Sequence, residues 1–108
     1  MERDFDGLVR QGDVTLVPVK GVEPKGEARA SKAGLVILLE GEATGHHHSL
    51  VADKAEVIDA AEGIFVRIME VVELTHQEHG AVTLAPGLYE LRLDMDYVPG
   101  ELPRRVLD

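Results

Sequence analysis

The sequence contains no cysteine. Disulfide bonds, thiolate metal sites and cysteine nucleophiles are therefore excluded together, and the absence suits a reducing cytoplasm. Tryptophan is also absent and aromatic residues make up only 4% of the chain, so a core has to be built from valine, leucine, isoleucine and alanine. The N-terminus lacks an apolar signal segment, and no apolar run approaches the roughly 18 residues that span a membrane. We expect a cytoplasmic protein with no membrane partner.

Positive charge is scarce as well. The chain has 11 lysine and arginine residues against 20 aspartate and glutamate residues, a formal net charge of −9. A general DNA- or RNA-binding protein needs a basic surface that neutralises phosphates, so that class is not expected. The balance is still compatible with a small anionic ligand held in a local pocket.

Short apolar runs separated by glycine and proline turns predict an all-β fold. With 108 residues, 44% of them hydrophobic, we expect one domain over residues 1–108. The expected architecture is a small β-sandwich or barrel with short hairpins, and exposed sheet edges favour a homodimer. The predicted strands are residues 13–19, 35–39, 44–51, 64–74 and 88–97.

Four segments need a more detailed prediction. Pro18 lacks a backbone donor, so the strand at 13–19 is expected at a sheet edge or to end there. The apolar run at 35–39 is expected to be buried on both faces. Residues 52–61 suit either a strand or a helix. Residues 100–108 are expected to form a tail or a short helical turn.

All five histidines fall into two groups, His46, His47 and His48 in the first and His76 and His79 in the second. Alternation along a strand places His46 and His48 on one face and His47 on the other. A hairpin that turns at 61–63 pairs His48 with His76, with Cβ atoms about 5 Å apart. The two groups are therefore expected to meet in one pocket.

This register has one conflict. It places Lys54 and Glu56 on the same inner face as the apolar residues of the hairpin. A β-bulge or a helix in this segment would remove the conflict and shift the pairing.

One chemical interpretation is a metal centre, because neutral imidazole is a common ligand for divalent transition metals. The set would be His46, His48 and His76, with Glu78 as a carboxylate ligand. The stretch from Gly45 to His48 resembles part of the metal-binding motif of cupins, which are small β-barrels. A cupin-like protein would be a metalloenzyme or a metal sensor.

The other interpretation is acid–base catalysis without a metal or other cofactor. Two imidazoles on either side of one phosphate can deprotonate a ribose 2′-hydroxyl and protonate the leaving 5′-oxygen. An anionic substrate would also need cations near the site. The candidate cations are Lys54, Arg67 and the pair Arg104-Arg105.

Four motifs span most of the chain: QGDV at 11–14, GEATGHHH at 41–48, HQEHG at 76–80 and PGLY at 86–89. This layout resembles a family of small bacterial and phage proteins with the pattern QGDV…GExTGHxH…HxEH…PGxY. Relatives of this kind are associated with ring nucleases, which degrade the cyclic oligoadenylate messengers of type III CRISPR defence. The resemblance implies a small anionic nucleotide as the ligand.

The same resemblance implies that His46, His48, His76 and His79 carry catalysis. The candidate substrate-binding residues are Thr44, Gly45, Lys54, Tyr89 and Tyr97. A third possibility is a non-enzymatic phage-type structural or adaptor domain, in which the histidines stabilise an interface.

Overall fold

A computed structural model describes residues 1–40, 45–93, 95–96 and 104–105. These residues form antiparallel strands and one short 3-10 helix, which confirms the predicted all-β fold. The elements are β1 (Glu2–Arg3), η1 (Phe5–Gly7), β2 (Val9–Gln11), β3 (Val14–Lys20), β4 (Gly26–Ala28), β5 (Leu35–Glu40), β6 (His47–Val51), β7 (Ala55–Ala60), β8 (Gly63–Ile68), β9 (Val72–Leu74), β10 (Val82–Leu84), β11 (Gly87–Leu93), β12 (Met95–Asp96) and β13 (Arg104–Arg105).

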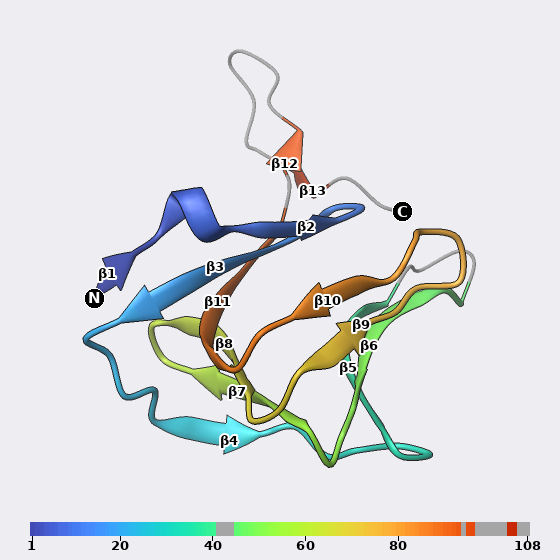
Figure 1. Cartoon of the computed structure of the whole chain (residues 1–108), viewed down its shortest axis with the longest axis horizontal. Helices are drawn as coiled ribbons and strands as arrows, with labels where there is room; N and C mark the ends of the chain where they lie inside the picture. Colours follow the sequence, from blue (N-terminus) through green and yellow to red (C-terminus); the bar gives the residue numbers. More distant parts are fainter. Residues whose placement is uncertain (41–44, 94, 97–103, 106–108) are drawn as a thin grey trace.

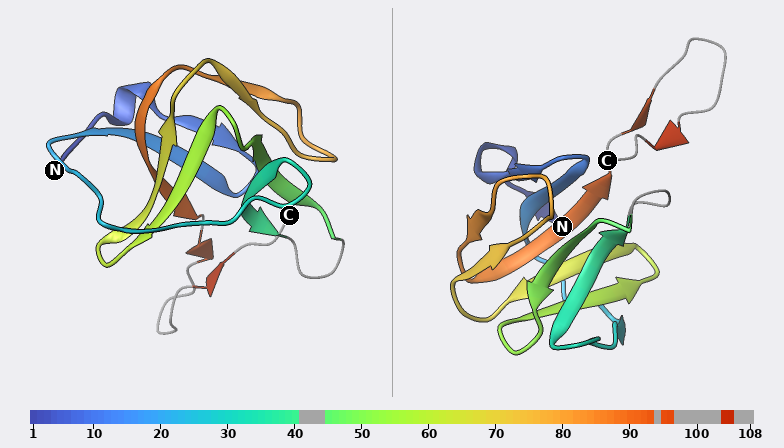
Figure 2. Two further views of the ribbon diagram at one scale, coloured as in Figure 1. Left: turned by 90° about the horizontal axis from the view of Figure 1, so that it is seen from below. Right: turned by 90° about the vertical axis from the view of Figure 1, so that its right-hand side faces the viewer.

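The strands form two groups. A seven-stranded sheet has the order β1-β3-β11-β8-β7-β4, with β2 also paired to β3. The second group consists of the β5–β6 and β9–β10 pairs, on the right in Figure 1. Reciprocal backbone hydrogen bonds of 3.0 Å between Ser49 and Thr75 connect these two pairs. Figure 2 shows the second group beside the larger sheet in two further views.

One hydrophobic core joins the two groups of strands. Leu16 and Val66 from the larger sheet belong to the same buried cluster as Leu50, Leu74 and Leu84 from the second group. Their side chains are at most 1% exposed. The β-branched and leucine side chains of alternating strand positions therefore supply the core that the scarcity of aromatic residues requires.

Residues 52–61 form a turn followed by β7, so the ambiguous segment contains a strand and no helix. The β7–β8 hairpin pairs Ala60 with Gly63, one residue away from the predicted register. This shift buries Ala55 and Val57, and leaves Lys54 and Glu56 on positions that are partly exposed. The register therefore differs by one residue between the β7–β8 hairpin and the Ser49–Thr75 bridge, and this difference removes the conflict in the prediction.

Pro18 was predicted at an edge, and that prediction is wrong. It lies inside the sheet, opposite Tyr89 of β11. The Pro18 carbonyl accepts a 2.8 Å hydrogen bond from the Asp4 amide. The nitrogen and the oxygen of one strand residue point to the same side, so the Pro18 nitrogen also faces this side. There η1 lies between β1 and β2, the two strands that pair with β3, and no described strand residue needs a donor from Pro18.

Two further expectations need correction. In β5 only Val36 and Leu38 are buried, whereas Leu35, Ile37 and Leu39 are half-exposed. The strand is therefore covered on one face and not on both. At the C-terminus, Arg104–Arg105 forms strand β13, which pairs with β12, and not a helical turn. The rest of residues 100–108 lies outside the described residues.

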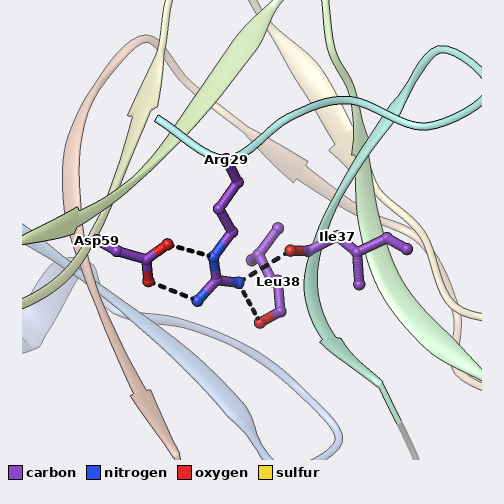
Figure 3. A network of polar contacts seen from close by, with 4 residues as sticks. All are labelled: Arg29, Ile37, Leu38 and Asp59. Atoms are coloured by element: carbon purple, nitrogen blue, oxygen red, sulfur yellow. Dashed lines mark hydrogen bonds and ion pairs between the residues drawn. The ribbon is translucent and has the colours of Figure 1, made fainter. Parts of the chain in front are cut away.

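A β-bulge in β5 fixes the position of the second group on the larger sheet. Leu38 is the extra residue, because Ile37 pairs with Ser49 and Leu39 pairs with His48. The Arg29 guanidinium donates to the carbonyls of Ile37 and Leu38 at 3.0 and 2.9 Å (Figure 3). Its other two nitrogens donate to Asp59 of β7, both at 2.8 Å. Arg29 therefore connects the bulge to the larger sheet.

Candidate functional site

The first histidine group lies at the start of β6. Gly45 has a φ of +72°, a left-handed conformation that glycine adopts without strain, and the chain turns there into the strand. The Ser49–Thr75 bridge then places His48 directly opposite His76, in the predicted register. Gly45, a candidate substrate-binding residue, thus has a backbone role in this structure.

Four of the five histidines converge. The ring centroids of His48 and His76 are 4.4 Å apart, and those of His76 and His79 are 4.6 Å apart. His46 lies 5.6 Å from His76, with the ring planes at 76°. The His48 and His79 rings are 6.0 Å apart and nearly parallel. We call these four residues the histidine cluster, and His76 is at its centre.

His47 lies outside the histidine cluster, as strand alternation predicts. Its backbone amide donates to the Gln77 side chain at 2.8 Å. Its side chain lines a separate shallow pocket with Lys32, Ile37 and Glu40. His47 is therefore a natural control for any experiment on its two neighbours.

His48 is buried and held by Gln11. Its Nδ1 lies 2.8 Å from Gln11 Oε1, and only 1% of the residue is exposed. The Gln11 Nε2 donates to the carbonyls of Leu74 and Gly80, both at 2.9 Å, which fixes the orientation of the amide. Since Oε1 can only accept, His48 Nδ1 is the donor and carries a hydrogen.

The second nitrogen of His48 faces a carboxylate. Its Nε2 lies 3.4 Å from Asp13 Oδ1, and Asp13 is 3% exposed. Asp13 and Gly12 form the two-residue turn between β2 and β3, and Gly12 has a φ of +57°. Sequence reasoning gave neither Gln11 nor Asp13 a role, because a Gly-Asp turn between strands usually lies at the surface.

His76 has a fixed tautomer as well. Its Nδ1 accepts hydrogen bonds from the backbone amides of Glu78 and His79, at 3.0 and 3.3 Å. In the neutral ring the hydrogen is then on Nε2, which is a donor. The His46 Nδ1 lies 3.4 Å from Glu78 Oε1. His46, His76 and His79 are half-exposed and reach solvent.

The remaining candidate residues divide into those the structure places elsewhere and those it does not describe. Lys54 lies in the turn after β6, beyond the opposite end of the strand from His46. Tyr89 donates to the Ala85 carbonyl at 2.8 Å and lines a cavity of about 330 Å³ with Arg3 and Lys20. Burial raises the pKa of its hydroxyl. Thr44 and Tyr97 lie outside the described residues.

The cations expected near the substrate are also in other contacts. Arg67 pairs with Glu23 at 3.2 Å and with Glu56 at 3.8 Å. Arg104 and Arg105 are in β13. Within the described part of the chain, no three histidine, aspartate or glutamate side chains are arranged to hold a metal ion. The four-residue metal set stays a prediction.

A family model for a domain of unknown function, DUF8820, matches residues 10–94. The chain belongs to the DUF8820 family. The matched region includes the whole histidine cluster together with Gln11 and Asp13. No curated protein and no solved structure matches the chain. Among the described residues of this DUF8820 protein, no helix is long and apolar enough to cross a membrane.

Proposed function

We propose that the histidine cluster cleaves phosphodiester bonds in a small cyclic oligonucleotide such as cyclic oligoadenylate, by general acid–base catalysis without a metal. The observation that carries the proposal is the convergence of four imidazoles, two of which, His48 and His76, have their ring hydrogens fixed by different partners. Acid–base catalysis needs one imidazole that donates a proton and one that accepts it. The resemblance to relatives of ring nucleases supplies the substrate class.

His76 is suited to donate a hydrogen bond to the phosphate and to stabilise its negative charge in the transition state. Two backbone amides occupy its Nδ1, which leaves Nε2–H as the group that faces away from the backbone. The same arrangement makes His76 a poor metal ligand, because a ligating nitrogen needs a free lone pair. The Nε2–H would donate to a non-bridging oxygen of the phosphate, and the proton would stay on the ring, because a neutral imidazole that lost it would become an imidazolate.

His46 is suited to the role of general base. The Glu78 carboxylate beside its Nδ1 favours a hydrogen on that nitrogen and leaves the Nε2 lone pair to accept the 2′-hydroxyl proton. The 2′-oxygen then attacks phosphorus, the bond to the 5′-oxygen breaks, and a 2′,3′-cyclic phosphate forms. His79, the other half-exposed histidine of the cluster, would in its protonated form give a proton to the leaving 5′-oxygen.

The test is cleavage of cyclic oligoadenylate by the untagged protein in the presence of a chelator. His46→Ala should lower the rate about 10²–10⁴-fold, the range of a lost general base. His76→Ala should lower it about 10²–10³-fold, as for a lost donor to the transition state, and His48→Ala should also lower it, because the His48 ring packs against His76. His47→Ala is the matched control and should retain the rate, since its side chain lies outside the cluster. Circular dichroism checks that each variant is folded.

Other outcomes point to the other classes. Cleavage that the chelator stops and a transition metal restores would support a cupin-like metal centre. Histidine variants that change subunit assembly, in a protein that cleaves nothing, would support a structural or adaptor domain. Wild-type cleavage that survives in all three variants would exclude the proposal.

A further inference from the structure

Gln11, Asp13 and His48 are three polar residues buried within the core. Their exposed fractions are 3%, 3% and 1%. His48 contacts both of the others: its Nδ1 is 2.8 Å from Gln11 Oε1 and its Nε2 is 3.4 Å from Asp13 Oδ1. Burying a carboxylate away from water is costly unless a cation or a donor faces it.

The hydrogen bonds restrict where protons can be. Gln11 uses both hydrogens of its amide on two backbone carbonyls, so it can only accept from His48 Nδ1. A neutral His48 with its hydrogen on Nδ1 would turn the lone pair of Nε2 toward an ionised Asp13, which is repulsive. A proton therefore has to lie between Nε2 and Oδ1.

We propose that His48 is held as an imidazolium, with both ring nitrogens protonated, between the Gln11 carbonyl and the Asp13 carboxylate. An imidazole is ordinarily more basic than a carboxylate by more than two pKa units, so the shared proton belongs on the histidine. The Nδ1–H of the imidazolium then donates to Gln11, its Nε2–H faces Asp13 at 3.4 Å, and the Asp13 charge has a cation beside it.

This assignment separates His48 from the other three histidines. At 1% exposure His48 cannot touch a substrate in this conformation, and a doubly protonated ring cannot act as a base. Its ring centroid instead lies 4.4 Å from that of His76, the proposed hydrogen-bond donor to the phosphate. Gln11 and Asp13 are thus positioning residues, which act through His48 on His76; this role rests on the proposed function, whereas the protonation state does not.

The test is the state of the two ring nitrogens of His48, measured by long-range ¹H–¹⁵N correlation NMR on the ¹⁵N-labelled full chain at neutral pH. Both nitrogens should resonate in the range of protonated N–H nitrogens. A His48 ring with one nitrogen in the unprotonated range would overturn the proposal. This measurement on the wild-type protein needs no substrate and no variant.

The Asp13→Asn variant tests the cause. Its amide can donate to Nε2 but cannot stabilise a charge, so the Nε2 signal should move to the unprotonated range while Nδ1 stays protonated. Glu90→Gln removes another buried carboxylate, one that pairs with Arg3, and should leave both His48 signals in place. Unchanged His48 signals in Asp13→Asn would contradict the role of Asp13. Failure of the cleavage assay alone would leave the assignment intact.

Discussion

At the scale of single residues, a buried carboxylate again depends on a distant partner. Alternation along β11 places the Glu90 side chain on the face opposite to Tyr89 and Leu91, which belong to the core. Glu90 is nevertheless only 7% exposed. Arg3 covers it, with Nε 2.8 Å from Oε1 and a second nitrogen 3.1 Å from Oε2. Alternation along the strand does not reveal this burial, because the partner of Glu90 is 87 positions away in the sequence.

This pair predicts a pH-dependent contribution to stability. The hydrogen bond from Arg3 lowers the pKa of Glu90 below its ordinary value of 4.5. A carboxyl whose pKa is lower in the folded state contributes stability above its unfolded pKa and loses it as the pH falls through the folded value. Glu90→Gln should therefore cost about 1 kcal/mol at pH 7, since the charged bidentate bond is partly screened by solvent at Arg3.

Urea unfolding at pH 7 and at pH 3 measures this effect. The difference between wild type and Glu90→Gln should shrink as the pH falls from 7 toward 3, because protonation of the wild-type carboxyl removes the ionic contribution. Glu27→Gln, at an exposed position of β4, is the control and should change the stability by less than about 0.5 kcal/mol at either pH. A Glu90→Gln cost that is the same at both pH values would refute the ionic origin.

At the scale of elements, the bulge in β5 depends on one side chain. Arg29 makes four hydrogen bonds at once, to two carbonyls of the bulge and to both oxygens of Asp59, whose pKa this bond lowers. A lysine carries the same charge on a single nitrogen and cannot reach both elements in this geometry. Arg29→Lys should therefore lower the free energy of unfolding by about 1–3 kcal/mol.

Chemical denaturation compares this variant with Arg67→Lys. Arg67 bonds only to exposed carboxylates, so its replacement should cost no more than about 0.5 kcal/mol. Amide exchange should also show faster opening of β5 in Arg29→Lys, because the bulge loses the donor for two carbonyls. Equal stability of the two variants would show that Arg29 does not fix the bulge.

The strands themselves were largely predictable from local pattern, and so was the meeting of the histidines. Alternation and the branched apolar runs predict β3, β5, β8 and β11, and the pairing of His48 with His76 follows from parity and one turn. The one-residue error at Gly63 left this pairing intact, because a compensating shift occurs before Ser49. Short-range rules thus located the cluster but not the exact path to it.

The residues that hold the cluster could not be predicted in this way. Gln11 and Asp13 lie at the end of a hairpin whose sequence is typical of an exposed turn. Both residues are buried in contact with His48 of β6. The bulge at Leu38 likewise depends on Arg29, nine positions earlier in the chain. Both features arise from contacts between elements, which the order of residues along one strand does not encode.

At the scale of the whole molecule, the net charge of −9 opposes the approach of the proposed anionic substrate. The Debye length is about 30 Å at 0.01 M salt and about 8 Å at 0.15 M. The molecule measures 41 × 32 × 26 Å, so at low salt nearly all of its charges act on a ligand at the histidine cluster. At 0.15 M only the charges close to the cluster do.

Added salt should therefore raise kcat/KM for cyclic oligoadenylate, about two- to tenfold between 0.01 and 0.15 M, because it screens the repulsion that slows association. Enzymes that attract anionic substrates through a basic surface show the opposite trend. The double variant Glu70→Gln/Glu73→Gln removes two exposed charges outside the cluster and should weaken the dependence on salt without altering kcat. A kcat/KM that falls with salt would mean that a local positive field, and not the net charge, governs how the substrate reaches the site.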